Sequence, residues 1–401
     1  MTRPAYWYPL AKPCFGEPEA AAVADVIRSG QTTMWDRTRE YEAALAKELG
    51  AKHAVACNSG SSADLLVALA LVNPLLDPDR GGWLRPSDEV LIPAVTWPTH
   101  VWAARLAGLT VRLIDVDPAT LNAGPAQYAE AMERYAQVRA FWPVHLMGNP
   151  VDVVGLAYLA RPEGIVIVAD GCEAFGARAA GRPIAGWAHA TTLSTFFSHQ
   201  GAVTMEGGAV LTDDARFADV CRLIRAHGWT RNATPDAFPL GDYSGDPRYA
   251  FVCEGLNVRP TEAQAAMGLV QLGRWPEFQA NRAARAAQFR AWAEQTGVLD
   301  VPAVRADAEP SWLGLPVLVR PDAPVTRDAL QAHLEAHGVE TRAIVAGNLA
   351  RQPAARYYPE LRGHFPGADA VHNRGLYVGL HGTTTADEIA RVCETFEEAW
   401  R

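Results

Sequence analysis

Residues 191–214 read TTLSTFFSHQGAVTMEGGAVLTDD, and this stretch contains two apolar runs separated by a polar loop and a glycine pair. Each run has the length and composition of a buried β-strand. Helical stretches, notably around residues 126–136, separate several further runs of the same kind upstream. Alternating strands and helices with continuously apolar strands predict an α/β fold with a mainly parallel sheet, covered by helices on both faces. The upstream runs occupy residues 89–95, 110–117, 139–147 and 164–170.

The chain is long enough to form two lobes, and its patterns indicate where they divide. A helical region over residues 261–294 is suited to a connector between lobes. A strand-like run at 313–320 and a helical run at 327–337 follow it, which is typical of a small α+β unit. Residues 232–249, rich in Gly, Pro, Asp and Ser, are expected to form a long surface or active-site loop. We expect an N-terminal segment over 1–30, a large cofactor-binding domain over 31–280 and a small domain over 281–401.

The bulk composition argues against several classes of protein. The 401 residues carry a formal net charge of -9 without a visible basic patch, so nucleic-acid binding is not expected. No apolar run reaches the length of a transmembrane helix, and no signal peptide is apparent at the N-terminus. We therefore expect a cytoplasmic protein that neither spans nor binds a membrane.

The distribution of Cys, His and Lys narrows the possible chemistry. The six cysteines lie far apart in the sequence, so we expect reduced thiols, no iron–sulfur cluster and no cysteine-bound metal. We also expect no metal-binding pair among the eleven histidines. Lysine occurs only as Lys12, Lys47 and Lys52. The part of the chain from His53 onward therefore offers no lysine amine to a cofactor.

A polar turn, Asn58-Ser59-Gly60-Ser61-Ser62-Ala63, lies between a predicted strand and a predicted helix. Free amides at a helix N-terminus, together with hydroxyl groups, form a favourable site for a phosphate. An ordinary helix N-cap explains the same motif equally well.

Two further residues stand at positions where ligands bind in α/β proteins. Asp170 ends the strand GIVIVAD, and carboxylates at the carboxyl ends of parallel strands face the ligand crevice. Such a carboxylate can hold a protonated pyridine nitrogen, although many strands end in Asp. His199 lies in the loop before the glycine pair Gly207-Gly208. A satisfied loop or core histidine is the commoner explanation of a lone His.

Taken together, these strings resemble the DegT/DnrJ/StrS sugar aminotransferases, a family of fold type I vitamin-B6 enzymes. The resemblance runs from FGEPEAAAVADVIRSG (15–30) through ADGCEAFGA (169–177) to GLNVRPTEAQAAMG (255–268). It implies an aspartate-aminotransferase-like fold, with a seven-stranded large domain and a small C-terminal α+β domain. Family aminotransferases bind the cofactor covalently through a lysine at the position of His199. A histidine there resembles the subgroup of nucleotide-sugar 3-dehydratases, most of all those acting on GDP-4-keto-6-deoxy-mannose.

The resemblance also assigns roles to individual residues. It implies that His199 is the acid–base catalyst and that Asn257 reaches the cofactor phosphate from the second subunit of a homodimer. Trp97 would stack on the pyridine ring, for which a core aromatic is the alternative. For Arg231, a surface arginine is as good an explanation as substrate contact. The implied cofactor ligands are Gly60, Ser61, Ser62, Trp97, Asp170, Glu173, Ser194 and Asn257, and the implied substrate contacts are His227, Arg231 and Arg259.

The absence of a lysine beyond Lys52 favours pyridoxamine 5′-phosphate or pyridoxal 5′-phosphate bound without a covalent link. The resemblance then implies that the cofactor amine condenses with the C-4 ketone of a nucleotide-linked 4-keto-6-deoxyhexose. His199 would move the proton that allows the C-3 hydroxyl to leave, with L-glutamate as the amino donor that regenerates the cofactor. Two alternatives remain open. They are an atypical sugar aminotransferase using untethered pyridoxamine phosphate and a non-catalytic cofactor-binding homologue.

Overall fold

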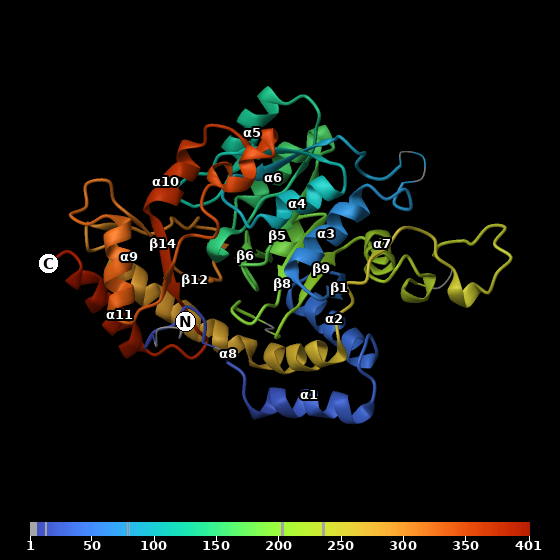
Figure 1. Cartoon of the computed structure of the whole chain (residues 1–401), viewed down its shortest axis with the longest axis horizontal. Coiled ribbons are helices and arrows are strands. Elements are labelled where there is room, and N and C mark those ends of the chain that lie inside the picture. Colours follow the sequence, from blue (N-terminus) through green and yellow to red (C-terminus); the bar gives the residue numbers. More distant parts are fainter. Residues whose placement is uncertain (1–5, 13, 78, 80, 202–203, 235–236) are drawn as a thin grey trace.

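A computed structural model of the chain contains the predicted large sheet (Figure 1). The strands pair in parallel except at β9, which runs antiparallel to both of its neighbours. The expectation of a mainly parallel seven-stranded sheet is therefore confirmed. In sheet order the strands are β1 (His53–Cys57), β9 (Gly208–Thr212), β8 (Ala190–Ser194), β5 (Val166–Asp170), β4 (Val138–Phe141), β2 (Glu89–Pro93) and β3 (Thr110–Ile114). The structure describes residues 6–12, 14–77, 79, 81–201, 204–234 and 237–401.

The side chains of β1 show that both faces of the sheet are covered. Val55 and Cys57 point into the main hydrophobic core, which also contains much of α3. Ala54 and Ala56, which alternate with them, belong to a second apolar cluster with residues of α2 and α8. The helices of the large domain are α1 (Glu17–Ser29), α2 (Asp36–Glu48), α3 (Gly60–Leu71), α4 (Thr99–Leu106), α5 (Pro125–Arg134), α6 (Val153–Ala160) and α7 (Ala215–Arg225).

The connecting helix α8 (Glu262–Ala293) is a single long element that starts at a capping box formed by Thr261 and Gln264. It runs along the lower side of both lobes in Figure 1. Because α8 continues across residue 280, the proposed domain boundary at that residue stays a prediction. Short 3-10 segments at Thr230–Asn232 and Pro247–Tyr249 flank an arm that extends to the right of Figure 1, where the long loop was predicted.

The small lobe is built around an antiparallel four-stranded sheet with helices packed against it. A further three-stranded sheet, made of two-residue strands, joins residues of both lobes, and the sequence pattern does not predict it. Strands this short carry no periodicity that could reveal them. The four-stranded sheet has the order β10 (Leu299–Asp300), β12 (Gly314–Val319), β14 (Gly375–Gly379) and β13 (Thr341–Arg342). The small sheet comprises β11 (Ala308–Glu309), β6 (Arg178–Ala179) and β7 (Arg182–Pro183), and the helices are α9 (Arg327–Ala336), α10 (Pro366–Arg374) and α11 (Ala386–Glu398).

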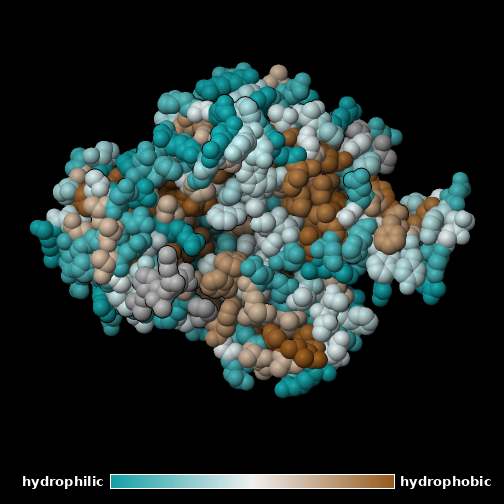
Figure 2. Space-filling view, viewed as in Figure 1, coloured by the Kyte–Doolittle hydropathy of each residue, from teal (hydrophilic) through white to brown (hydrophobic). Residues whose placement is uncertain are grey.

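The surface of the molecule carries separate apolar areas. Figure 2 shows hydrophobic residues gathered over α3 and α4, and again at the lower edge beside α1. Leu106, at the end of α4, and Ile27, in α1, are both strongly exposed. Among the described residues, no helix combines the length and the hydropathy needed to cross a membrane.

Candidate active site

A cavity of about 300 Å³ opens where the carboxyl ends of the central parallel strands face the small lobe. This is the edge of an open α/β sheet at which ligands bind. The cavity brings together residues that are widely separated in the sequence. The predicted site residues in its lining are Gly60, Ser61, Trp97, Asp170, Glu173, Ser194 and His199.

One end of the cavity is formed by the N-terminus of α3. Ser59 is the N-cap residue, and its hydroxyl accepts a hydrogen bond from the Ser62 amide. Gly60 lies so close to Ser194 that an added Cβ would come within 2.8 Å of the serine Cβ. The amides at the start of α3 and the hydroxyl of Ser194 therefore lie side by side, and both can donate hydrogen bonds to a phosphate. The Ser62 hydroxyl bonds to Ser59 (3.0 Å) and is not in the cavity lining, so its role as a cofactor ligand stays a prediction.

A buried charge cluster lies at the base of the cavity. Asp170 Oδ2 is 3.0 Å from His100 Nε2, and Asp64 Oδ1 lies 3.5 Å from the same nitrogen. Burial alone would lower the pKa of His100, but the two carboxylates outweigh it and raise that pKa to about 10. Burial raises the pKa of Asp170, but the charge of His100 outweighs it and holds that pKa below its usual value. Asp170 is thus kept as a carboxylate, the form that accepts a hydrogen bond from a protonated ring nitrogen.

The imidazole of His199 is fixed by the backbone. Its Nδ1 lies 2.7 Å from the carbonyl oxygen of Cys172. A carbonyl oxygen only accepts hydrogen bonds, so Nδ1 carries the hydrogen and Nε2 keeps its lone pair. Burial lowers the pKa of His199, and the hydrogen bond to Cys172 opposes that effect only in part. The neutral ring can therefore accept a proton at Nε2 near neutral pH.

The loop that carries His199 is held by its neighbour Gln200, whose side-chain amide donates hydrogen bonds to the carbonyls of Glu173 and Ser311. Glu173 itself lines the cavity, and burial raises its pKa to about 7 although the Met147 amide donates to its carboxylate. The carboxyl group of Glu173 can therefore gain or lose a proton near neutral pH, which suits a group beside the ring hydroxyl of a cofactor.

Trp97 follows β2 and lines the cavity with 54% of its surface exposed. A large aromatic side chain that is left open in this position is not a core residue. The alternative of a core aromatic is therefore wrong, and the exposed ring is available to stack on a planar ligand.

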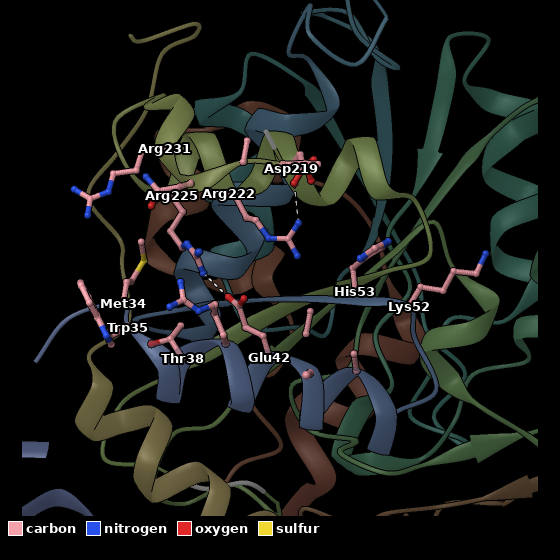
Figure 3. Close-up of a pocket in the computed structure, with 17 residues that line it drawn as sticks. Met34, Trp35, Thr38, Glu42, Lys52, His53, Asp219, Arg222, Arg225 and Arg231 are labelled. Atoms are coloured by element: carbon pink, nitrogen blue, oxygen red, sulfur yellow. Dashed lines mark hydrogen bonds and ion pairs between the residues drawn. The ribbon is translucent and has the colours of Figure 1, made fainter. Parts of the chain in front are cut away.

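Besides Ser62, four predicted site residues lie outside this cavity. Arg231 instead lines a separate cavity of about 480 Å³ (Figure 3). Arg222, Arg225 and residues of α2 also line this second cavity. Asn257 is exposed, and its side-chain oxygen accepts a hydrogen bond of 2.9 Å from Arg259. His227 is also exposed, with a left-handed φ of 67°. The structure does not place these residues with His199 within one chain.

The cavity also contains residues that the sequence did not predict as part of the site. Asp64 and His100 meet Asp170 only through the fold, since they come from three separate segments. Arg342, on β13, is the only arginine or lysine among the described residues of the lining. The strings SADLL and AVTWPTH contain Asp64 and His100, but no local spacing relates either of them to Asp170.

The residues present fit a B6 cofactor on their own chemistry. The start of α3 lies at the cavity, where its free amides can donate hydrogen bonds to a phosphate. Asp170 is a charged carboxylate at the opposite, buried side, and an open indole lies at the wall. The phosphate, the pyridinium nitrogen and the aromatic ring of the cofactor are thus matched by the amides of α3, by Asp170 and by the indole of Trp97. None of the three lysines lines the cavity, although Lys12 lines a small separate pocket with His199, where its amine lies 3.5 Å from Glu388.

Comparisons with known proteins point in the same direction. The DegT/DnrJ/EryC1/StrS aminotransferase family model matches residues 13–397. A GDP-4-keto-6-deoxy-D-mannose 3-dehydratase from Yersinia pseudotuberculosis is 34% identical over 387 residues, which cover 95% of this chain and 96% of that protein.

Two solved structures are similar over nearly the whole chain. One is a variant of GDP-4-keto-6-deoxymannose-3-dehydratase with bound GDP-perosamine, with a TM-score of 0.89 and 32% identity, covering 97% of this chain and 100% of that one. The other is a GDP-4-keto-6-deoxymannose-3-dehydratase with a trapped PLP-glutamate geminal diamine. Its TM-score is 0.88 at 31% identity, and it covers 97% of this chain and 100% of that one.

Proposed function

Because this chain belongs to the DegT/DnrJ/EryC1/StrS aminotransferase family, we propose that it is a B6-dependent C-3 dehydratase of a nucleotide-linked 4-keto-6-deoxyhexose in deoxysugar biosynthesis. The observation that carries the proposal is His199, a neutral imidazole that stands in the cavity where no lysine is present. An imidazole moves protons but forms no stable covalent link to the cofactor, which favours dehydration over transamination of the sugar. The similar dehydratases support the same reaction.

The roles of the chain's residues follow from their places in the cavity. The amides of Gly60 and Ser61 and the hydroxyl of Ser194 bind the cofactor phosphate, and Asp170 accepts a hydrogen bond from the ring nitrogen. Pyridoxamine phosphate, when bound without a covalent link, supplies the amine for the C-4 ketone and the electron sink for loss of the C-3 hydroxyl. In its neutral form, Nε2 of His199 would take up the proton released from the amine-bearing carbon of the cofactor. As imidazolium it delivers that proton to the departing hydroxyl, which leaves as water.

The proposal is tested by incubating the protein with pyridoxamine phosphate, L-glutamate and GDP-4-keto-6-deoxy-mannose, followed by mass spectrometry of the sugar. Loss of the C-3 oxygen is the expected result. A stable 4-amino sugar would replace the proposal with the atypical aminotransferase. Binding of the cofactor without turnover of any nucleotide-linked keto sugar would replace it with a non-catalytic homologue.

The pH dependence of the reaction should carry the signature of His199. A general base acts only in its unprotonated form, and burial lowers the pKa of His199 from its ordinary value. The imidazole therefore stays active to more acidic pH than a free histidine. We expect the acidic limb of kcat against pH to lie below about pH 6.5. An acidic limb above pH 7 would contradict the assignment.

Arg342 is the candidate for binding a carboxylate of L-glutamate, because it is the only described arginine or lysine lining the cavity. Replacing Arg342 by Gln should raise the KM for L-glutamate by about ten- to a hundredfold, the range of one lost charge-assisted hydrogen bond. A single turnover of protein already loaded with pyridoxamine phosphate should keep its rate. Arg320→Gln, an exposed arginine of the same lobe outside the lining, is the matched control. An increase in the KM of the sugar alone would instead assign Arg342 to the substrate diphosphate.

We further propose that two chains form a homodimer with shared sites. The support is that His227, Arg231 and Asn257 are exposed and outside the cavity of their own chain. The arm beside them also exposes the rings of Tyr249 and Phe251, both stacked against Trp229. Exposed aromatic faces and the apolar areas of Figure 2 are typical of protein interfaces.

Shared sites can be tested by complementation. His199→Asn and Asn257→Asp are each expected to be inactive alone. In a mixed dimer, one of the two sites would combine an intact His199 with an intact Asn257 of the partner subunit. Random re-association should thus restore about a quarter of the wild-type activity. No recovery, with mixed dimers shown by mass spectrometry, would exclude the sharing of these two residues across the interface.

A further inference from the structure

A second cluster of potential ligands lies in the small lobe, and none of its residues lines the cavity. His333 is in α9, His337 is its C-cap residue and Glu398 ends α11. One ligand atom from each of the three lies within 4.8 Å of the other two. The expectation that no histidine pair has metal-ligand spacing was wrong, since His333 and His337 are four residues apart. That spacing places both rings on one face of a helix.

The hydrogen bonds leave one nitrogen of each ring available. His337 Nδ1 lies 2.8 Å from the carbonyl oxygen of His333, so Nδ1 donates and Nε2 keeps its lone pair. A histidine that binds a metal is usually held by such a bond from its other nitrogen. His333 Nε2 has no hydrogen-bond partner among the described residues, and it lies 4.0 Å from the carboxylate of Glu398.

The backbone around His337 is also anchored. The indole nitrogen of Trp7 donates to the carbonyl of His337 (2.9 Å), and the Tyr8 amide donates to the carbonyl of Gly338 (3.1 Å). Glu398 is the last residue of α11 and has no arginine or lysine partner in the described part of the chain. Its neighbour Glu397, in contrast, binds Arg401 and the indole of Trp292.

The two imidazole rings are in direct contact. Their centroids are 4.1 Å apart and the rings are stacked at 28°. The three ligand atoms lie within 4.8 Å of one another, and rotation of the exposed side chains of His337 and Glu398 can bring them closer to the half-buried His333.

We propose that His333, His337 and Glu398 bind a divalent transition-metal ion, with Zn²⁺ as the best match. Two imidazoles, one carboxylate and a water complete a tetrahedral zinc shell. The ion would connect α9 to the end of α11 and so stabilise the small lobe. The site lies outside the cavity of His199 and is independent of the proposed dehydration.

The test is a calorimetric titration of the cofactor-loaded protein, freed of metal beforehand, with Zn²⁺. We expect saturable binding of about one ion per chain with a Kd in the micromolar range or below, and no comparable binding of Mg²⁺, which prefers oxygen ligands. His337→Ala and Glu398→Gln should each weaken the binding by about tenfold or more. His364→Ala, an exposed histidine outside the cluster, is the matched control and should bind as the wild type does.

A second measurement guards against indirect effects of the substitutions. Zn²⁺ should raise the thermal midpoint of the wild type and of His364→Ala, but not that of His333→Ala. Circular dichroism would confirm that each variant is folded. The proposal is overturned if the wild type shows no saturable Zn²⁺ binding, or if His333→Ala and His337→Ala bind it as tightly as the wild type does.

Discussion

His199→Asn should bind pyridoxamine phosphate as well as the wild type does and lose dehydration by roughly 10²–10⁴ in kcat, the usual range for a lost general acid–base. The Asn side chain still offers an amide hydrogen to the Cys172 carbonyl, so the loop keeps its anchor. It has no basic nitrogen with which to move a proton. Rapid-quench kinetics of a single turnover measure the chemical step, and cofactor fluorescence measures binding.

His364→Asn serves as the control, because it makes the same change at an exposed position outside the cavity. It should leave both measurements at wild-type values. Dehydration by His199→Asn at more than a tenth of the wild-type rate would refute the role of His199. Loss of cofactor binding in that variant would instead give the ring a structural role.

Asp170→Asn should reduce both stability and activity, because it removes one partner from a buried ion pair. His100 would keep its charge only through Asp64, at the longer separation of 3.5 Å. Breaking a buried pair from one side typically costs about 3–5 kcal/mol of folding free energy. Cofactor affinity should fall too, because an amide does not hold a pyridinium nitrogen as a carboxylate does. Chemical denaturation and titration with pyridoxal phosphate measure the two effects.

Asp300→Asn is the matched control for stability. Asp300 is paired with Arg320 at 3.6 Å, but on the surface, where such pairs contribute about 0–1 kcal/mol. Combining Asp170→Asn with His100→Gln should cost less than the sum of the two single changes, because they remove the same interaction. Additive losses would show that Asp170 and His100 act independently.

The sequence predicted the large sheet well because most residues of its strands are buried and apolar. Runs such as GIVIVAD have no polar alternation, and this pattern distinguishes them from the surrounding helices. The two-residue strands of the small sheet were not predicted. They depend on contacts between distant segments, such as the pairing of Ala308 with Ala179.

The site residues show the same difference between local motifs, which the sequence reveals, and contacts between distant segments, which it does not. Gly60, Asp170 and His199 each lie in a local motif next to a strand, and the fold brings them into one cavity. The partners that set their charge are not local. His100 reaches Asp170, at the end of strand β5, from helix α4, and the carbonyl that holds His199 belongs to Cys172. No periodicity or motif encodes such contacts, which only the folded chain makes.

The hydrogen bond from His199 to the Cys172 carbonyl affects what a mutational scan of this site would detect. The group that directs the ring is a main-chain atom, which every amino acid possesses. In Cys172→Ala the main-chain carbonyl would remain, so the imidazole should keep its orientation. The determinant would become visible only through chemistry that edits the peptide unit itself, such as replacement of that amide by an ester or a thioamide. A tolerated substitution at position 172 would therefore not show that the main chain of this residue has no role in orienting His199.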